Sequence, residues 1–443
     1  MFAILQHRTF RRLFLAQMVA LIGTGLATVA LALLAYDIAG AKAGEVLGTA
    51  LAIKMVVYVL LAPVSGALVP PRLRKTVLIV LDLIRAGVAL ALPFVTEIWQ
   101  VFLLIAFLQS ASAGFTPLFQ SVIPEILPDE HDYTRALSLS RLAYDLESLL
   151  SPMLAAALLT VISFHGLFAG TSAGFVLSAL LVLGTTFPVA VAAPTGRPYG
   201  RAIRGMRTYL HTPRLRGLLA INLVAAAGGA MVFVNTVVIV RTVLGGGERE
   251  VAWALASFGG GSMLLALVLP KLLDRLTDRR VMLVAAAAMV LALATGTLAW
   301  LMQARLPWPA LFILWTAMGM AYAGMVTPGG RLIRRSAGPE ALPFLFAAQF
   351  SLTHVCWLVA YPLAGWLGSR LGMQAALMAL TVLALLGLVT AMLTWPAHDA
   401  VEVEHRHDDL PADHPHRREH ASDSGRPHTH VLHIDELHPR WPG

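Results

Sequence analysis

Cysteine and charged residues are scarce in this chain of 443 residues. Its single cysteine, Cys356, excludes an intrachain disulfide. Only 13% of the residues are charged and 57% are hydrophobic, whereas about a quarter of the residues of a soluble domain are charged. The composition therefore excludes an ordinary soluble domain and predicts an integral membrane protein.

Sequence motifs of nucleotide binding and catalysis are absent as well. The chain has no Gly-rich phosphate-binding loop, no paired histidines of a zinc-protease helix and no serine turn of an α/β-hydrolase. ATP-driven transport and enzymatic activity therefore have no support. We expect no bound cofactor and no nucleic-acid partner.

Long apolar runs recur along most of the chain. A helix needs roughly 20 apolar residues to cross about 30 Å of hydrocarbon. The sequence predicts twelve such spans, at residues 14–36, 46–69, 77–95, 99–123, 139–162, 168–190, 218–240, 251–273, 281–301, 310–333, 344–367 and 373–395. The predicted fold class is an all-α integral membrane protein.

Basic residues gather in alternate loops, which sets the expected orientation in the membrane. The first residues, MFAILQHRTFRRLFLAQ, lack a small-residue cleavage site, so the first span itself is the predicted insertion signal. Because arginine and lysine mark cytoplasmic loops, their distribution predicts that both termini are cytoplasmic. We expect the protein to reside in the bacterial inner (plasma) membrane.

The longest break between spans divides them six and six. It contains the segment APTGRPYGRAIRGMRTYLHTPRLRG, whose six arginines predict a cytoplasmic linker with an amphipathic helix along the membrane face. The expected domains are an N-terminal bundle at 1–193, the linker at 194–216, a C-terminal bundle at 217–396 and a tail at 397–443. Short basic turns at matching positions of the two halves, SGALVPPRLRKTVL and LPKLLDRLTDRRVML, are typical of parallel-repeat transporters.

Twelve spans, the six-plus-six division and the paired turns resemble the major facilitator superfamily, which implies two six-helix bundles and secondary active transport. The stretch LDRLTDRR is similar to the signature turn of that family. This similarity implies a gate motif made of Asp274, Arg275, Asp278, Arg279 and Arg280. The first-half turn departs from the pattern, because Val69, Pro70 and Pro71 replace the expected acidic and basic residues.

Further stretches resemble narrower groups of that superfamily. VLDLIRA, FTPLFQSVIPEILPDE and LLSPML resemble the drug:proton antiporter branch. IGTGLATVALALLAYDIAG, LGTALAIKM, SRLAYDLESLLSP and the histidine-rich end are similar to bacterial nickel-resistance permeases of the NreB type. The second resemblance implies nickel efflux.

Ionisable residues inside the spans are candidates for function, because a charge in hydrocarbon costs several kcal/mol. Asp82 and Arg85, three residues apart near the cytoplasmic end of span three, are expected to form a structural salt bridge that sets a closed gate. Lys54 in span two is expected to neutralise Asp37 or a carboxylate of span five, or to extend its side chain to the membrane interface.

Span five carries the densest set of polar residues, in the segment SRLAYDLESLLSP at 140–152. Since successive helix residues turn by about 100°, Arg141 and Asp145 share one stripe of this helix and Glu147 lies on another. We expect Arg141 and Asp145 to form an intrahelical or gate ion pair, in preference to a direct contact with substrate.

Glu147 has no obvious partner on its own helix. A carboxylate in a low-dielectric cavity accepts a proton readily, so it loads a proton from one side and releases it on the other. We therefore expect Glu147 to serve proton coupling or cation binding. His354 in span eleven is predicted either as an imidazole ligand or as a packing residue bonded to a backbone carbonyl.

The tail from residue 397 differs in chemistry from everything before it. It contains ten histidines, ten carboxylates and five arginines, but neither cysteine nor methionine. Imidazoles suit nickel, cobalt, zinc and copper(II), whereas the lack of sulfur argues against copper(I). The alternative is a disordered hydrophilic tail without metal. The predicted metal ligands are His405, His407, His414, His416, His420, His428, His430, His433 and His438.

The combined interpretation is a proton-coupled exporter of a divalent transition-metal ion, with nickel preferred. Its expected partners are the lipid bilayer, the transported ion and protons. One alternative is an exporter of organic molecules or metal chelates with a regulatory tail, and another is a transporter-like metal sensor that moves nothing.

Overall fold

The computed structural model describes residues 2–69, 71–127, 153–187, 198–302, 307–336, 342–397, 402–405 and 428–431, together with residues 129, 132, 136, 139, 140, 143, 147, 150 and 151. The first-half helices are α1 (Arg8–Ala39), α2 (Ala43–Leu68), α3 (Arg74–Ala91), α4 (Ile98–Ile126) and α6 (Phe164–Leu183). Short 3-10 helices occupy Phe2–Gln6, Gly40–Lys42, Pro71–Leu73 and Leu92–Phe94.

The helices that follow are α7 (Pro198–His211), α8 (Pro213–Val238), α9 (Glu248–Leu273), α10 (Asp278–Leu301), α11 (Trp308–Val326), α12 (Gly329–Arg334), α13 (Leu342–Pro362), α14 (Gly368–Arg370) and α15 (Met373–Thr394). Two π-helical segments, Ile239–Val243 and Leu363–Leu367, extend α8 and α13. Pro362, the residue directly before the second of these, has no backbone N–H and so interrupts the regular hydrogen bonding of the helix.

Ten helical stretches among the described residues are long and apolar enough to cross a membrane. The first stretch, Arg8–Leu61, combines α1 with most of α2. Eight of the 24 residues of predicted span five lie outside the described residues, and described members such as Leu139, Ala143 and Glu147 are helical. The structure thus confirms an all-α membrane fold.

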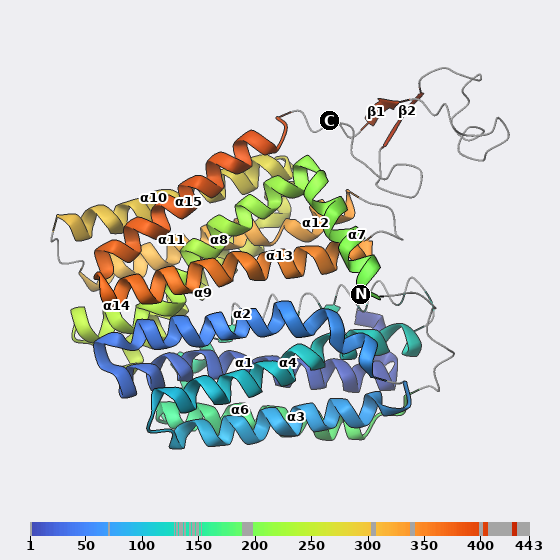
Figure 1. Ribbon diagram of the computed structural model, residues 1–443, viewed down its shortest axis with the longest axis horizontal. Helices are drawn as coiled ribbons and strands as arrows, with labels where there is room; N and C mark the ends of the chain where they lie inside the picture. Colours follow the sequence, from blue (N-terminus) through green and yellow to red (C-terminus); the bar gives the residue numbers. More distant parts are fainter. Residues whose placement is uncertain are drawn as a thin grey trace.

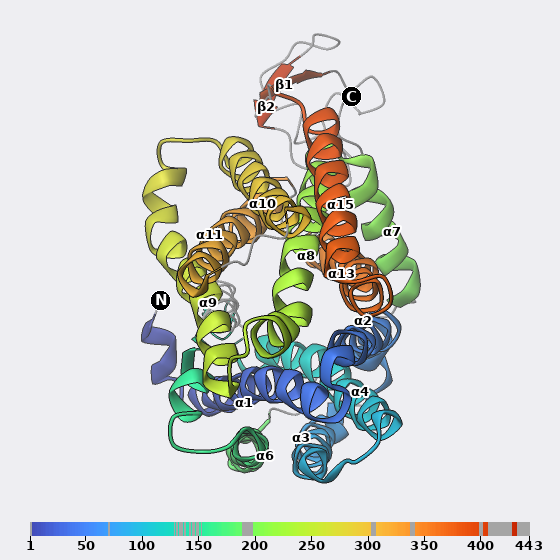
Figure 2. The same ribbon diagram turned by 90° about the vertical axis from the view of Figure 1, so that its left-hand side faces the viewer.

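The helices form two bundles stacked on one another, which Figures 1 and 2 show from two directions. In one bundle α1 packs on α6, α2 on α4, and α3 on both α4 and α6. In the other, α8 packs on α15, α9 on α11, and α10 on both α11 and α15. The main contact between the bundles joins α2 to α13.

The linker helix α7 lies at the end of the bundles where α1 begins (Figure 1). It packs on α13, α8 and α2, and the buried Tyr209 donates a hydrogen bond from its hydroxyl to Oε1 of Gln349 on α13. The helix α8 begins at Pro213, inside the segment expected as linker. The boundaries at 193 and 396 stay predictions.

Two short strands lie in the tail, β1 (Glu402–His405) and β2 (His428–Val431). They pair antiparallel, with His405 opposite His428 and Val403 opposite His430. The fold of the membrane part is therefore helical, and the strands described belong to the tail alone.

Candidate functional site

A cluster of ionisable and aromatic side chains lies between the two bundles at mid-helix. Lys54 and Tyr58 come from α2, His354 comes from α13, and Glu147 comes from the predicted fifth span. Lys54 is about 17 Å along the axis of α2 from its first residue, near the middle of a bilayer. All four side chains keep partial exposure, as expected of groups that line the space between two bundles.

Lys54 connects the cluster. Its ammonium interacts electrostatically with the Glu147 carboxylate and with the His354 ring. Lys54 Nζ also lies 5.8 Å from the centroid of the Tyr58 ring. The structure therefore favours the span-five carboxylate over Asp37 as the counter-charge of Lys54, since Asp37 is exposed near the end of α1.

Glu147 lies against α1 at a place where that helix has no side chain. A Cβ atom on Gly25 would overlap Ser151 and lie 2.9 Å from Oε1 of Glu147. Ser151 Oγ lies 2.6 Å from the Glu147 carbonyl oxygen, to which it donates, and 3.4 Å from Oε1. Glu147 therefore has a hydrogen-bond partner on its own helix, which was not expected, and Lys54 of α2 interacts with it electrostatically.

His354 has one ring nitrogen engaged. Its Nδ1 lies 2.6 Å from the carbonyl oxygen of Phe350, which accepts, so Nδ1 carries the hydrogen and Nε2 keeps its lone pair. The ring stacks on Tyr58 with centroids 5.3 Å apart and planes 7° from parallel. The ring is thus bonded to a backbone carbonyl, as one of the two alternatives predicted, and its role as a ligand stays a prediction.

Asp82 and Arg85 form an ion pair buried in the first bundle. Ser178 of α6 donates a 2.7 Å hydrogen bond to Oδ2 of Asp82. The Arg85 guanidinium lies 4.1 Å from the centroid of Phe115 and 4.5 Å from that of Phe175. The pair was expected near the cytoplasmic end of its span, but Asp82 is about 12 Å from the first residue of α3, close to its middle.

The signature turn between α9 and α10 holds one buried acid. Asp278 bonds to two arginines that follow α11, with Arg331 Nε 3.4 Å from Oδ1 and Arg335 Nη1 3.1 Å from Oδ2. Arg279 Nε donates to the Trp395 carbonyl at 3.1 Å. Asp274, Arg275 and Arg280 are exposed. Of the predicted gate motif, therefore, Asp278 and Arg279 contact neighbouring elements through their side chains.

The two bundles also meet tightly at the end opposite α7, near the start of α2. Arg370 Nη2 lies 3.0 Å from Glu45 Oε1, and Trp366 Nε1 donates to Thr49 Oγ1 at 2.7 Å. A Cβ atom on Gly48 would lie 2.8 Å from the Tyr361 carbonyl oxygen. We call this contact between residues 44–49 and 361–370 the outer seam, after the side of the membrane that the sequence predicts for this end. Its presence means that the bundles are closed there.

The outer seam was not predicted from the sequence. Gly44 and Gly48 stand four residues apart and so share a face of α2, which is the spacing of close helix contacts in membranes. This spacing is a detectable signal. The partner glycine, Gly365, lies in a π-helical segment that the apolar pattern does not reveal.

Metal ligands do not converge within the described part of the chain, where no group of three or more His, Cys, Asp or Glu side chains is placed to hold a metal ion. Of the nine predicted tail ligands, His405, His428 and His430 belong to the paired strands. The other six, together with Arg141 and Asp145 of span five, lie outside the described residues.

Comparison with known proteins identifies the family. The family model described as Major Facilitator Superfamily matches residues 13–247 and 218–412, which together cover most of the chain. The chain is 24% identical over 341 residues to the uncharacterized MFS-type transporter YfiS of Bacillus subtilis (strain 168), an alignment that covers 75% of this chain and 80% of that protein.

Solved structures show the same fold at low sequence identity. A variant of the nucleoside transporter NupG has a TM-score of 0.67 at 14% identity, with 88% of this chain and 100% of that chain covered. An inward-facing, unoccupied bacterial homolog of the human lysosomal transporter Spinster has a TM-score of 0.64 at 14% identity, covering 87% and 96% of the two chains. A D-xylose-proton symporter gives 0.60 at 15% identity, covering 90% and 98%. The chain belongs to the Major Facilitator Superfamily and is a multi-pass membrane transporter of that fold.

Proposed function

We propose that this chain exports a divalent transition-metal cation, with Ni²⁺ as the first candidate, in exchange for protons. The observation that carries the proton coupling is the placement of the Glu147 carboxylate beside Lys54, between the two bundles. The observation that carries the metal is the histidine-rich tail. Both termini and α7 are then cytoplasmic, the membrane is the bacterial inner membrane, and the closed outer seam corresponds to an inward-facing state.

Glu147 and Lys54 supply the coupling in this proposal. A carboxylate next to an ammonium is held in its ionised form, whereas desolvation favours the neutral acid. Movement of the bundles changes how far water reaches the space between them, and so changes which of these effects dominates. Glu147 then takes up a proton from the outer side and releases it to the cytoplasm, where cargo and Lys54 compete for the freed carboxylate.

His354 contributes a neutral ligand to the same path. Its free Nε2 is a donor atom that suits nickel, cobalt and zinc. Because Lys54 carries a positive charge close by, a divalent cation binds here only when the Lys54 ammonium moves away or the carboxylate is ionised. This requirement links cargo binding to the protonation state of Glu147.

The tail concentrates metal at the cytoplasmic entrance under this proposal. Imidazoles tethered to a transporter raise the effective concentration of a bound ion near the transport path. The two strands bring His405 and His428 to directly opposed positions, although these residues are far apart in sequence. Tail and transport site would act in sequence, the first for capture and the second for movement.

A second candidate function is the export of organic molecules or metal chelates by the same coupling. The aromatic stack of Tyr58, His354 and Phe350 favours it, with ring centroids of Phe350 and His354 4.1 Å apart. Flat organic cargo binds well between such rings. In that case the tail regulates the transporter.

Uptake into inverted membrane vesicles separates these possibilities. An exporter of the bare ion accumulates ⁶³Ni²⁺ in vesicles with an acidic interior, and the accumulation collapses when a protonophore removes the gradient. An exporter of chelates accumulates nickel only when a chelator is added. A metal sensor accumulates no nickel, with or without the chelator. Accumulation that requires a chelator, or no accumulation at all, contradicts bare-ion export.

A further inference from the structure

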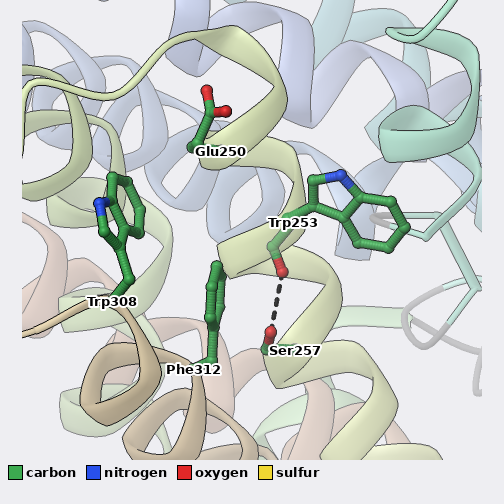
Figure 3. A pocket seen from close by; sticks show the side chains of 5 residues that line it. All are labelled: Glu250, Trp253, Ser257, Trp308 and Phe312. Atoms are coloured by element: carbon green, nitrogen blue, oxygen red, sulfur yellow. Dashed lines mark hydrogen bonds between the residues drawn. The ribbon is translucent and has the colours of Figure 1, made fainter.

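A pocket unrelated to the central cluster opens at the outer ends of α9 and α11. Its volume is about 520 Å³, and it is lined by Glu250, Trp253, Ser257, Trp308 and Phe312. Figure 3 shows Glu250 above Phe312, with Trp308 on one side and Trp253 on the other. Within the part of the chain that the structure describes, the lining therefore combines one carboxylate, one hydroxyl and three aromatic rings, without a basic side chain.

The aromatic wall is held in place by close packing. Trp308 and Phe312 stack with ring centroids 5.9 Å apart and planes 28° from parallel. A Cβ atom on Gly246 would lie 2.6 Å from Cη2 of Trp308, so the glycine lets the loop before α9 press against the indole. These two contacts hold the Trp308 ring in place without a ligand.

Only one of the two carboxylate oxygens of Glu250 accepts a hydrogen bond from a described residue. Its Oε2 accepts a 2.7 Å hydrogen bond from the Gly247 backbone N–H, which orients the side chain. Among the described residues, no hydrogen bond or ion pair involves Oε1. The neighbouring Arg249 donates instead to the Thr160 carbonyl at 3.2 Å, across to the first bundle. A negative charge is therefore available beside the aromatic rings.

We propose that this pocket binds an organic ammonium group, carried either by a phospholipid headgroup or by a soluble amine. Aromatic faces attract cations, and a carboxylate adds direct charge pairing with an N–H donor. Trp253 is 53% exposed beside the pocket, and a tryptophan at a helix end marks the level of lipid headgroups. A headgroup ammonium reaches this level without leaving the membrane.

Binding in this pocket would affect the outer end of the transporter. Arg249 joins the two bundles one residue before Glu250, so an ammonium held by Glu250 lies close to a contact that closes the outer end. Occupancy of the pocket would then favour the closed outer end. This effect is separate from the coupling at Glu147 and does not depend on the identity of the cargo.

Binding to the purified full-length protein tests the proposal. The probes are dihexanoyl phosphatidylethanolamine, dihexanoyl phosphatidylglycerol and tetramethylammonium, measured by native mass spectrometry and isothermal titration. We expect saturable binding of an ammonium probe, about tenfold weaker binding in Glu250→Gln and in Trp308→Leu, and unchanged binding in the control Glu248→Gln. Glu248 lies in the same first turn of α9 but does not line the pocket.

The probes distinguish the sources of the ammonium. Binding of phosphatidylethanolamine but not tetramethylammonium identifies a lipid site, and the reverse identifies a soluble amine. Equal affinity of wild type and Glu250→Gln, or equal binding of the phosphatidylglycerol that lacks an ammonium, overturns the proposal. Thermal unfolding of each variant confirms that it is folded, and Phe312→Leu replaces Trp308→Leu if the latter does not fold.

Discussion

At the scale of single residues, the pairing of Glu147 with Lys54 leads to a prediction that separates coupling from stability. Replacement of Glu147 by glutamine removes the carboxylate whose charge stabilises the Lys54 ammonium, and so lowers the stability of the protein. We expect Glu147→Gln to abolish transport while the protein stays inserted, with a lower unfolding temperature. The double variant Glu147→Gln with Lys54→Met should recover the unfolding temperature but not transport.

The measurement is thermal unfolding in detergent together with vesicle uptake for each variant. Asp37→Asn is the matched control, because Asp37 is also a carboxylate on a membrane helix but is exposed near the end of α1. Wild-type transport by Glu147→Gln would remove the coupling role from this residue. Failure of the double variant to regain stability would show that Lys54 and Glu147 do not compensate one another.

Asp82 is predicted to act on stability and gating and not on coupling. Asp82→Asn leaves the buried Arg85 guanidinium without its carboxylate, whereas Ser178→Ala removes one hydrogen bond worth about 1 kcal/mol. We expect the loss of unfolding temperature to be clearly larger for Asp82→Asn than for Ser178→Ala, with residual transport in both. Asp82→Asn with normal stability and no transport would reverse the assigned role.

At the scale of helices, the outer seam depends on direct contact between the backbone of α2 and the backbone of the segment that follows α13, with no side chain between them. A Cβ atom on Gly365 would overlap the Gly44 carbonyl and lie 3.1 Å from the Gly48 Cα, so Gly365→Val must separate α2 from the end of α13. We expect this variant to populate a state that is open at the outer end. The matched control is Gly87→Val, because a Cβ at Gly87 meets nothing within 4 Å.

The opening is measured by the reaction of Thr49→Cys with a membrane-impermeant maleimide, in a background where Cys356→Ser removes the native thiol. The rate should rise at least severalfold in Gly365→Val and stay unchanged in Gly87→Val. Equal rates in both would show that the seam does not close the outer end.

Most membrane helices were predictable, because twenty apolar residues in a row have few alternatives in a bilayer. The depth of Asp82 was misjudged, since apolar residues alone do not mark where a helix begins, and α3 starts at Arg74. A carboxylate of span five was only one of three alternatives expected for Lys54. A pattern within one helix does not determine which residue of another helix faces it, and Lys54 lies 93 positions away from Glu147.

At the scale of the whole molecule, the tail is expected to change the concentration dependence of transport and not its chemistry. Truncation after Ala397 should leave a folded exporter that needs more metal to reach the same flux, because the tethered imidazoles are lost. Imidazole coordinates only when neutral and has an unperturbed pKa of about 6.5. The advantage of the intact chain should therefore be present near pH 7.5 and disappear near pH 5.5.

Flux against metal concentration, measured for intact and truncated protein at both pH values, checks this prediction. An intact chain in which the tail histidines are replaced by glutamine is the control for the loss of length alone. Identical curves for all three proteins at pH 7.5 would show that the tail captures no metal, and would favour the organic cargo.

The central claim is that an inward flow of protons through Glu147 drives the outward movement of a bare divalent metal ion. Its most direct test is purified protein in liposomes, with a pH-sensitive dye on one side and Ni²⁺ added on the other. We expect that nickel moves protons in the opposite direction, that the ion and the protons keep a fixed ratio, and that Glu147→Gln abolishes both movements. Nickel flux without proton movement, or proton movement that responds to organic cations and not to nickel, would contradict it.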